Sequence, residues 1–167
     1  RATLSVVFNR WRQWDWIAAQ RVDRYVANST MTQRRVRRYL GREADVVYPP
    51  VELERFTVSE PGDAYVVLSE LVPHKRIEVA IEAFTRAFDP GDGPQLVVKC
   101  IGAERHAEAH KRLLDAAAAH DHVHVLDQAL SPGDMAALTE ACDAYVSLHR
   151  SEGFGLTIAE AMLPHAA

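Results

Sequence analysis

The sequence predicts an α/β fold in which helices cover both faces of a doubly wound parallel β-sheet. Short apolar runs such as YVVLS (65–69) and QLVVKCI (95–101) alternate with amphipathic stretches such as KRIEVAIEAFTRAF (75–88). Strands that are apolar throughout are typical of parallel sheets buried on both faces. The last strand then runs into a glycine-containing turn over residues 152–160. Ligands of such sheets bind beyond the carboxyl ends of the strands, where this turn is expected.

Composition limits the functional classes. The chain has 167 residues, 48% of them hydrophobic, which suffices for a sizeable core. Its 19 Lys and Arg against 23 Asp and Glu give a net charge of -4, which argues against a general nucleic-acid binder. No apolar run is long enough to span a membrane. The two cysteines, Cys100 and Cys142, lie in apolar surroundings. They indicate buried thiols in a reducing compartment, so we expect a cytoplasmic protein.

Residues 1–57 predict two helices and two short strands. Trp11, Trp14, Ile17 and Ala18 recur at helical spacing. The expected elements are a helix over 11–22, a strand over 25–27, a helix with Thr30 and Gln33 in capping-box spacing and Gly41 at its end, and a strand over 45–48 stopped by two prolines.

Residues 58–167 continue the alternation after a turn at Pro61 and Gly62. Ser131 and Pro132 suit the N-cap and first helical position of one helix. The expected strands cover 65–68, 95–101, 122–126 and 144–148, and the expected helices cover about 75–88, 108–119 and 131–142, with a last helix from about residue 155. Four strands leave a doubly wound domain incomplete, and the chain starts without Met. We therefore expect a piece of a longer polypeptide.

The stretch SEGFGLTIAEAM, residues 151–162, is the main candidate site. Gly153 and Gly155 follow a strand and precede a helix, so Glu152 is expected in the turn and Glu160 about one turn into the helix. The first amides of a helix and its dipole favour an anion such as phosphate. Carboxylates accept hydrogen bonds from sugar hydroxyls. A nucleotide sugar combines these groups.

Other interpretations of this stretch remain open from the residues alone. A glycine turn flanked by two solvated glutamates has the same pattern. Neither GxGxxG nor GxxxxGKS/T is present, so nothing supports a dinucleotide fingerprint or a P-loop.

Three stretches in register resemble retaining glycosyltransferases of family four, which have the two-domain GT-B fold of Rossmann-like domains. The Glu152-to-Glu160 spacing resembles that family's motif of two glutamates separated by seven residues. Residues 21–56 resemble the end of its N-terminal acceptor domain and the crossing to the second domain. Residues 65–84 resemble the start of its C-terminal, nucleotide-sugar-binding domain. The resemblance implies domains over 1–57 and 58–167, the second one incomplete.

The resemblance also implies roles for individual residues. Lys75 matches a lysine that contacts the donor diphosphate, and Arg76 follows it. Glu152 matches the catalytic glutamate beside the transferred sugar, and Glu160 matches a ligand of the nucleotide ribose. Amides of the turn would hold sugar and phosphate oxygens; these are the amides of Gly153, Phe154, Gly155 and Leu156. No cofactor or metal is implied if Lys75 and the helix amides supply the positive charge.

Two positions depart from the family pattern. Many members carry an arginine five residues before the lysine, where this chain has Glu70, so Arg76 or Arg150 would have to supply that charge. After Met162 the chain reads LPHAA, where the family continues with a glycine, a proline and another strand.

Other charged clusters are assigned to the surface. The run RRVRR, Arg34 to Arg38, would suit an anionic membrane surface, so peripheral contact at the inner membrane face is left open, but a solvated helix face is favoured. His106 and His110 have the i, i+4 spacing of metal ligands but lack a third ligand, so they are expected to be surface histidines.

The sequence therefore predicts transfer of a sugar, with mannose as one candidate, from a nucleotide diphosphate sugar to a glycan or lipid-linked acceptor with retention of configuration. The isolated chain is expected to be inactive. One alternative is a nucleotide-sugar-binding or interaction module without catalysis. Another is an unrelated sugar-phosphate enzyme of the doubly wound class, which would bind a monophosphate. Oligomeric state is left open.

Overall fold

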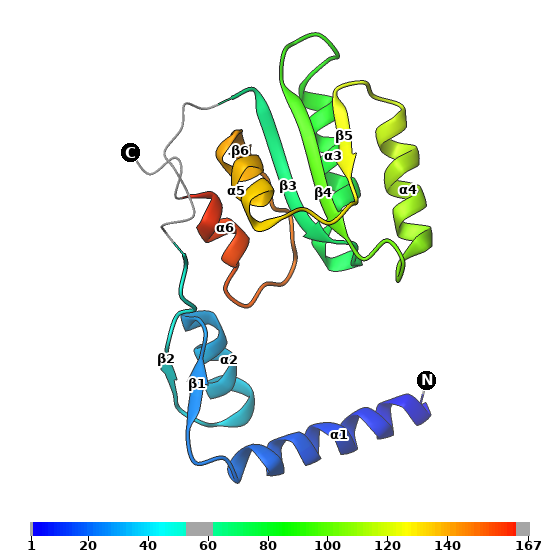
Figure 1. Ribbon diagram of the computed structural model, residues 1–167. Coiled ribbons are helices and arrows are strands. Elements are labelled where there is room, and N and C mark those ends of the chain that lie inside the picture. Colours follow the sequence, from blue (N-terminus) through cyan, green and yellow to red (C-terminus); the bar gives the residue numbers. More distant parts are fainter. Residues whose placement is uncertain (1, 53–61, 163–167) are drawn as a thin grey trace. The chain divides into compact units, whose positions relative to one another are not determined.

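The computed structural model describes residues 2–52 and 62–162 (Figure 1). Contacts divide the chain into two compact units, Arg1–Pro50 and Val51–Ala167, each with its own parallel sheet. The domain boundary predicted between residues 57 and 58 lies outside the described residues.

The first unit is a small α/β unit. Its elements are α1 (Ala2–Gln20), β1 (Tyr25–Ala27), α2 (Thr30–Leu40) and β2 (Ala44–Val46). Strands β1 and β2 pair in parallel, with Tyr25 opposite Ala44. The predicted bounds need two corrections. Helix α1 begins far before Trp11, and β2 ends two residues earlier than expected.

The capping prediction for α2 was wrong at its start and right at its end. Ser29, not Thr30, is the N-cap, and its Oγ accepts the Thr32 amide at 3.1 Å. The Gln33 side chain does not close a capping box; its Nε2 donates to the Ala44 carbonyl of β2 at 2.7 Å. Gly41 ends the helix with φ of 63°, as its position predicts.

The helical surfaces of this unit are largely solvated. All four arginines of the RRVRR run are exposed, which confirms the solvated helix face. The aromatic stripe of α1 is also exposed, with Trp11 63% and Trp14 70% accessible, while Ala19 is buried. Within the described residues, no helix has the length and apolarity needed to cross a bilayer.

The second unit contains a four-stranded parallel sheet in the order β5-β4-β3-β6. The elements are β3 (Ala64–Glu70), the 3-10 turn η2 (Pro73–Lys75), α3 (Ile77–Ala87), β4 (Gln95–Ile101), α4 (Ala107–Ala118), β5 (Val123–Leu126), α5 (Pro132–Glu140), β6 (Cys142–Tyr145) and α6 (Leu156–Ala161). The predicted parallel α/β sheet is confirmed.

Side-chain alternation along the strands explains why helices cover both faces. Leu96, Val98 and Cys100 are fully buried and point from one face of β4 into a core that includes side chains of α3 and α4. Val66 of β3 is equally buried on the other face. Figure 1 shows α5 and α6 on this side of the sheet, away from α3 and α4. Ser131 caps α5 with a complete capping box, as predicted.

Two predicted elements around the candidate site have different bounds. Strand β6 covers 142–145 instead of 144–148, because α5 ends at Glu140 and the chain enters the sheet at once, with a register shift in its pairing to β3. The helix expected from Lys75 begins at Ile77, because Arg76 takes a left-handed conformation with φ of 57° and separates it from η2.

The core assignment can be tested at Leu96. Replacing this fully buried side chain in Leu96→Ala should lower the free energy of unfolding by about 2–5 kcal/mol, because the cavity cannot collapse completely. Chemical denaturation monitored by circular dichroism measures the change. Ile101→Ala on the same strand is the control, since Ile101 is 53% exposed and its truncation should change stability far less. Equal losses would contradict the assigned faces of β4.

Candidate functional site

The loop after β3 places Lys75 at the carboxyl edge of the sheet. Pro73 suits the first position of η2, and the Lys75 amide donates to the Val72 carbonyl at 3.0 Å. Arg76 is the only non-glycine with positive φ among the described residues. Its left-handed conformation costs free energy that a glycine would not lose. The turn lets α3 fold back onto the sheet while Lys75 remains at the edge.

The glycine turn after β6 requires glycine at position 155. Gly155 is buried with φ of 87°, and a Cβ there would lie 3.2 Å from Ile158 Cδ1 and 3.5 Å from Glu152 Cγ. Its carbonyl accepts the amides of Ile158 and Ala159 at 3.1 and 3.0 Å, which starts α6. Glu152 therefore lies in the turn and Glu160 lies just beyond the first turn of α6, as predicted.

An ion pair joins the two segments. Lys75 Nζ lies 2.5 Å from Glu152 Oε2, and the two side chains are 24% and 32% exposed. A backbone contact supports it, because the Arg150 amide donates to the His74 carbonyl at 2.8 Å. Residues 77 positions apart in the sequence thus meet at the edge of neighbouring strands β3 and β6.

This contact sets the charge state of Glu152. The hydrogen bond from Lys75 holds the pKa of the Glu152 carboxyl below its ordinary value; the Gly153 amide, which donates to Glu152 Oε1 at 3.0 Å, acts in the same direction. Burial opposes both, and the positive charges of Lys75 and His149 lower the pKa further. Glu152 is therefore an ionised carboxylate whose two oxygens both have partners in the chain.

The structure brings some predicted residues into contact and leaves others nearby. Lys75, Glu152 and Gly153 are hydrogen-bonded to each other in a chain, and Gly155 packs beside the Glu152 side chain. The remaining four are adjacent in sequence or in the same helix: Arg76, Phe154, Leu156 and Glu160. No carboxylate of the described residues pairs with the Arg76 guanidinium, which leaves its charge available at this edge.

The negative charge at Glu70 has a partner that sequence reasoning missed. Arg105, in the loop after β4, places Nη2 3.4 Å from Glu70 Oε1. The predicted substitutes are placed differently, since Arg76 follows η2 and Arg150 contacts this region through its backbone amide. The ion pair could have been predicted from the position of Arg105 after β4, the strand that pairs with the strand of Glu70.

Tyr145, the last residue of β6, was also missed. Its Oη lies 3.2 Å from the Leu68 carbonyl oxygen and 2.9 Å from Thr157 Oγ1. Burial is the largest cause that raises the pKa of the Tyr145 phenol, and the negative charges of Glu152 and Glu160 add to it. The hydroxyl thus contacts β3 and the first turn of α6, the helix that carries Glu160. The sequence feature that could have identified Tyr145 is its position, as a polar aromatic residue at the end of the strand that precedes the motif.

The predictions for the histidines and cysteines can be compared with the structure. Among the described residues no group of three metal-ligating side chains is present. His110 is not a surface histidine as expected, because its side chain is 18% exposed and Nε2 lies 2.8 Å from Asp127 Oδ2. Cys100 and Cys142 are buried thiols that form no disulfide, as predicted, and burial raises the pKa of both.

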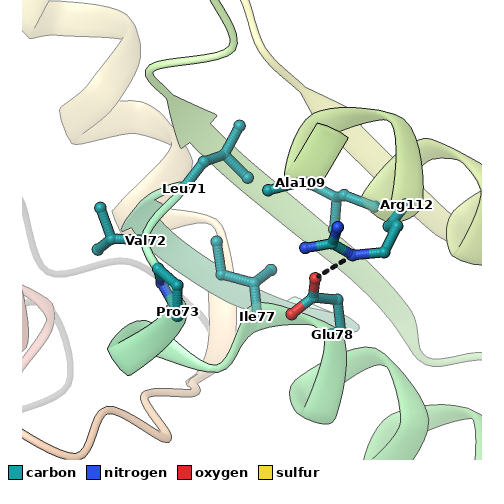
Figure 2. A pocket seen from close by; sticks show the side chains of 8 residues that line it. Leu71, Val72, Pro73, Ile77, Glu78, Ala109 and Arg112 are labelled. Atoms are coloured by element: carbon teal, nitrogen blue, oxygen red, sulfur yellow. Dashed lines mark ion pairs between the residues drawn. The ribbon is translucent and has the colours of Figure 1, made fainter. Parts of the chain in front are cut away.

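A small pocket lies on the α3–α4 side of the lysine loop and is separate from the ion pair (Figure 2). It has a volume of about 120 Å³ and mixed polar and apolar walls, with an ion pair between Arg112 Nε and Glu78 Oε1 at 3.5 Å. Its lining residues are Leu71, Val72, Pro73, Ile77, Glu78, Ala109, Arg112 and Leu113. None of the predicted site residues lines it.

The ion pair makes a measurable prediction. In Lys75→Met the pKa of Glu152 should rise toward its ordinary value, because its strongest partner is lost. Carboxyl NMR titration measures the pKa. The lowered pKa means that the pair stabilises the fold above the ordinary value of about 4.3 and that this contribution is lost as pH falls through the folded pKa. The stability difference between wild type and variant should therefore shrink on acidification.

Lys111→Met is the matched control, since Lys111 pairs with Asp115 on the surface of α4. It should leave the titration of Glu152 unchanged. An identical Glu152 titration in wild type and Lys75→Met would contradict the ion pair.

Comparison with solved structures identifies the fold. HepE from Anabaena, solved in complex with UDP and glucose, has a TM-score of 0.73 and 22% identity over 92% of this chain and 46% of its own. The pneumococcal O-GlcNAc transferase GtfA, solved with UDP and GlcNAc, has a TM-score of 0.61 and 18% identity over 93% of this chain and 31% of its own. These similarities show the fold, which is that of GT-B glycosyltransferases.

Sequence comparisons agree. The chain is 24% identical over 166 residues to the GtfA subunit of the UDP-N-acetylglucosamine–peptide N-acetylglucosaminyltransferase of Streptococcus gordonii, and it spans 31% of that relative's length. The model of the family described as glycosyl transferases group 1 matches residues 52–163, which include both segments of the ion pair. The chain belongs to the glycosyl transferases group 1 family.

Proposed function

We propose that this chain carries the donor site of a retaining glycosyltransferase that takes a sugar from a nucleoside diphosphate sugar. The observation that carries the proposal is the contact between Lys75 and Glu152 at the carboxyl edge of the sheet. Both residues lie within the part of the chain that matches the glycosyltransferase family. Ligands of open α/β sheets bind at this edge.

The proposed roles follow from the charge and hydrogen-bonding capacity of each group. Lys75 and Arg76 provide cations for the diphosphate, and Glu152 is the catalytic carboxylate beside the transferred sugar. Glu160 would accept hydrogen bonds from the ribose. The turn amides of Gly153, Phe154, Gly155 and Leu156 would hold sugar and phosphate oxygens.

Donor binding requires an exchange of partners. Lys75 and Glu152 now satisfy each other, and the Gly153 amide is turned to the Glu152 side chain. A diphosphate carries more negative charge than one carboxylate, so it would draw Lys75 away. Glu152 would then accept hydrogen bonds from sugar hydroxyls instead.

The same cations would stabilise the departing diphosphate. Negative charge develops on the leaving group as the glycosyl bond breaks, and fixed donors at that point lower the barrier. Because Lys75 and Arg76 supply positive charge from the chain itself, the proposed chemistry needs no metal or other cofactor.

The similar proteins suggest which ligands to test first. HepE was solved with UDP and glucose, and the pneumococcal GtfA was solved with UDP and GlcNAc. UDP is therefore the first nucleotide to test, with mannose kept as one candidate sugar. The proposed acceptor is a glycan or a lipid-linked glycan. A cytoplasmic location with peripheral contact at the inner membrane face is part of the proposal.

A second candidate is a nucleotide-sugar-binding module without catalysis. Glu70 favours this second candidate, because a carboxylate lies at the edge where catalysis would need positive charge for the departing diphosphate. Arg105 Nη2 lies 3.4 Å from Glu70 Oε1 and offsets part of this negative charge. Since the chain spans 31% of its curated relative, we expect binding but no transfer by the isolated 167-residue chain.

Nucleotide titration tests the shared part of both candidates. Isothermal titration of the chain should show binding of UDP or another nucleoside diphosphate and weaker binding of the monophosphate. Lys75→Met should weaken diphosphate binding by about tenfold or more, since a charge-assisted contact is lost. Lys111→Met, which removes an exposed lysine of α4, should bind like wild type. Tighter binding of the monophosphate would favour the sugar-phosphate enzyme instead.

The two glutamates should differ in effect. In an enzyme that contains this chain and transfers sugar, Glu152→Ala should lower kcat by about a hundredfold or more, because the group beside the reacting sugar is lost. Glu160→Ala should mainly raise KM for the donor. A donor-turnover assay measures both, with Glu82→Ala on the surface of α3 as control. Full activity in Glu152→Ala would overturn the catalytic assignment.

A further inference from the structure

The hydroxyl of Tyr145 links three elements of the sheet edge. Tyr145 ends β6, its Oη lies 3.2 Å from the carbonyl oxygen of Leu68 in β3, and the same Oη lies 2.9 Å from Thr157 Oγ1 in the first turn of α6. Two residues after Leu68 the chain leaves β3 for the loop that carries Lys75. One oxygen atom therefore lies between β3 and the helix of Glu160.

The number of available protons determines which group donates in each of these hydrogen bonds. A phenol has one proton, a carbonyl can only accept, and a threonine hydroxyl can donate or accept. Both contacts are hydrogen bonds at the same time when Thr157 donates to Tyr145 and Tyr145 donates to Leu68. Such chains of hydroxyls strengthen one another. Removing the Tyr145 oxygen would break both links at once.

Packing alone does not require this hydroxyl. Phenylalanine would fill the same space on β6, so the oxygen serves the two polar contacts. Burial and the charges of Glu152 and Glu160 raise the pKa of the phenol, so it stays protonated at neutral pH. Tyr145 thus adds a neutral hydrogen-bonding group between β3 and α6, without adding charge to the site.

We propose that Tyr145 is a positioning residue of the donor site, which fixes the first turn of α6, and with it Glu160, relative to the end of β3. This inference rests on the proposed function. Glu160 is three residues after Thr157 and so one helical turn further along α6. Without the Tyr145 hydroxyl, donor binding would have to order α6 against β3, and affinity for the nucleotide would fall.

Tyr145→Phe tests the proposal in the 167-residue chain by calorimetric titration with UDP. We expect the Kd to rise about 3- to 10-fold, the effect of one or two lost hydrogen bonds. Tyr65→Phe is the matched control. Tyr65 lies on β3 with its ring against Phe84 and Phe88, and its hydroxyl makes no hydrogen bond within the described part of the chain. It should bind UDP like wild type.

Substitutions at the exposed Thr157 test whether its hydroxyl is the partner that matters. Thr157→Val keeps the shape of the side chain but removes its hydroxyl, and it should weaken UDP binding, by no more than Tyr145→Phe does. Thr157→Ser keeps the hydroxyl and should bind UDP with the wild-type Kd. Adding Thr157→Val to Tyr145→Phe should cause little further loss, because Tyr145→Phe already removes the contact with Thr157.

A double-mutant cycle with Glu160→Gln separates positioning from general destabilisation. If Tyr145 acts through Glu160, Tyr145→Phe should raise the Kd much less in the Glu160→Gln background than in wild type. A purely structural effect would give the same fold-change in both backgrounds and would overturn the inference. Equal UDP affinity of wild type and Tyr145→Phe would also overturn it while leaving the proposed function intact. Failure of the wild-type chain to bind any nucleoside diphosphate would overturn both.

Discussion

The parallel pairing of β3 on both of its sides determines where the chemistry of this chain can occur. β3 lies between β4 and β6, and all three run in the same direction. Their carboxyl ends therefore meet at one edge. The loops that leave this edge carry Lys75, Arg105 and Glu152, residues separated by tens of positions in the sequence. Without the order β4-β3-β6 these charges would not lie near one another.

Local patterns predicted much of the fold. Strand β4 was predicted to the residue, since it is a short, mostly apolar run that is rich in β-branched residues and is bounded by Pro94 and Gly102. Gly155 was also predicted, because a strand that turns sharply into a helix needs a residue that accepts positive φ. The position of Glu152 in the turn and of Glu160 in the helix followed from it.

Features that depend on tertiary contacts were not predicted. Lys75 lies two residues after Pro73 and precedes a good helical pattern, so nothing local distinguishes a separate 3-10 turn from the first turn of α3. The partner of Glu70 is in another loop, and the hydroxyl of Tyr145 acts through a carbonyl 77 residues away. In α2, Ser29 and Thr30 are equally suitable caps, and the backbone conformation decided between them.

The left-handed conformation of Arg76 has a consequence for how this position responds to selection. Glycine would adopt the same backbone angles without steric cost, so a library sorted only for folded protein should enrich Arg76→Gly. Sorting the same library for ligand binding should favour the guanidinium instead. The two enrichment profiles would therefore differ at position 76, because glycine favours the stability of the loop and arginine provides its positive charge.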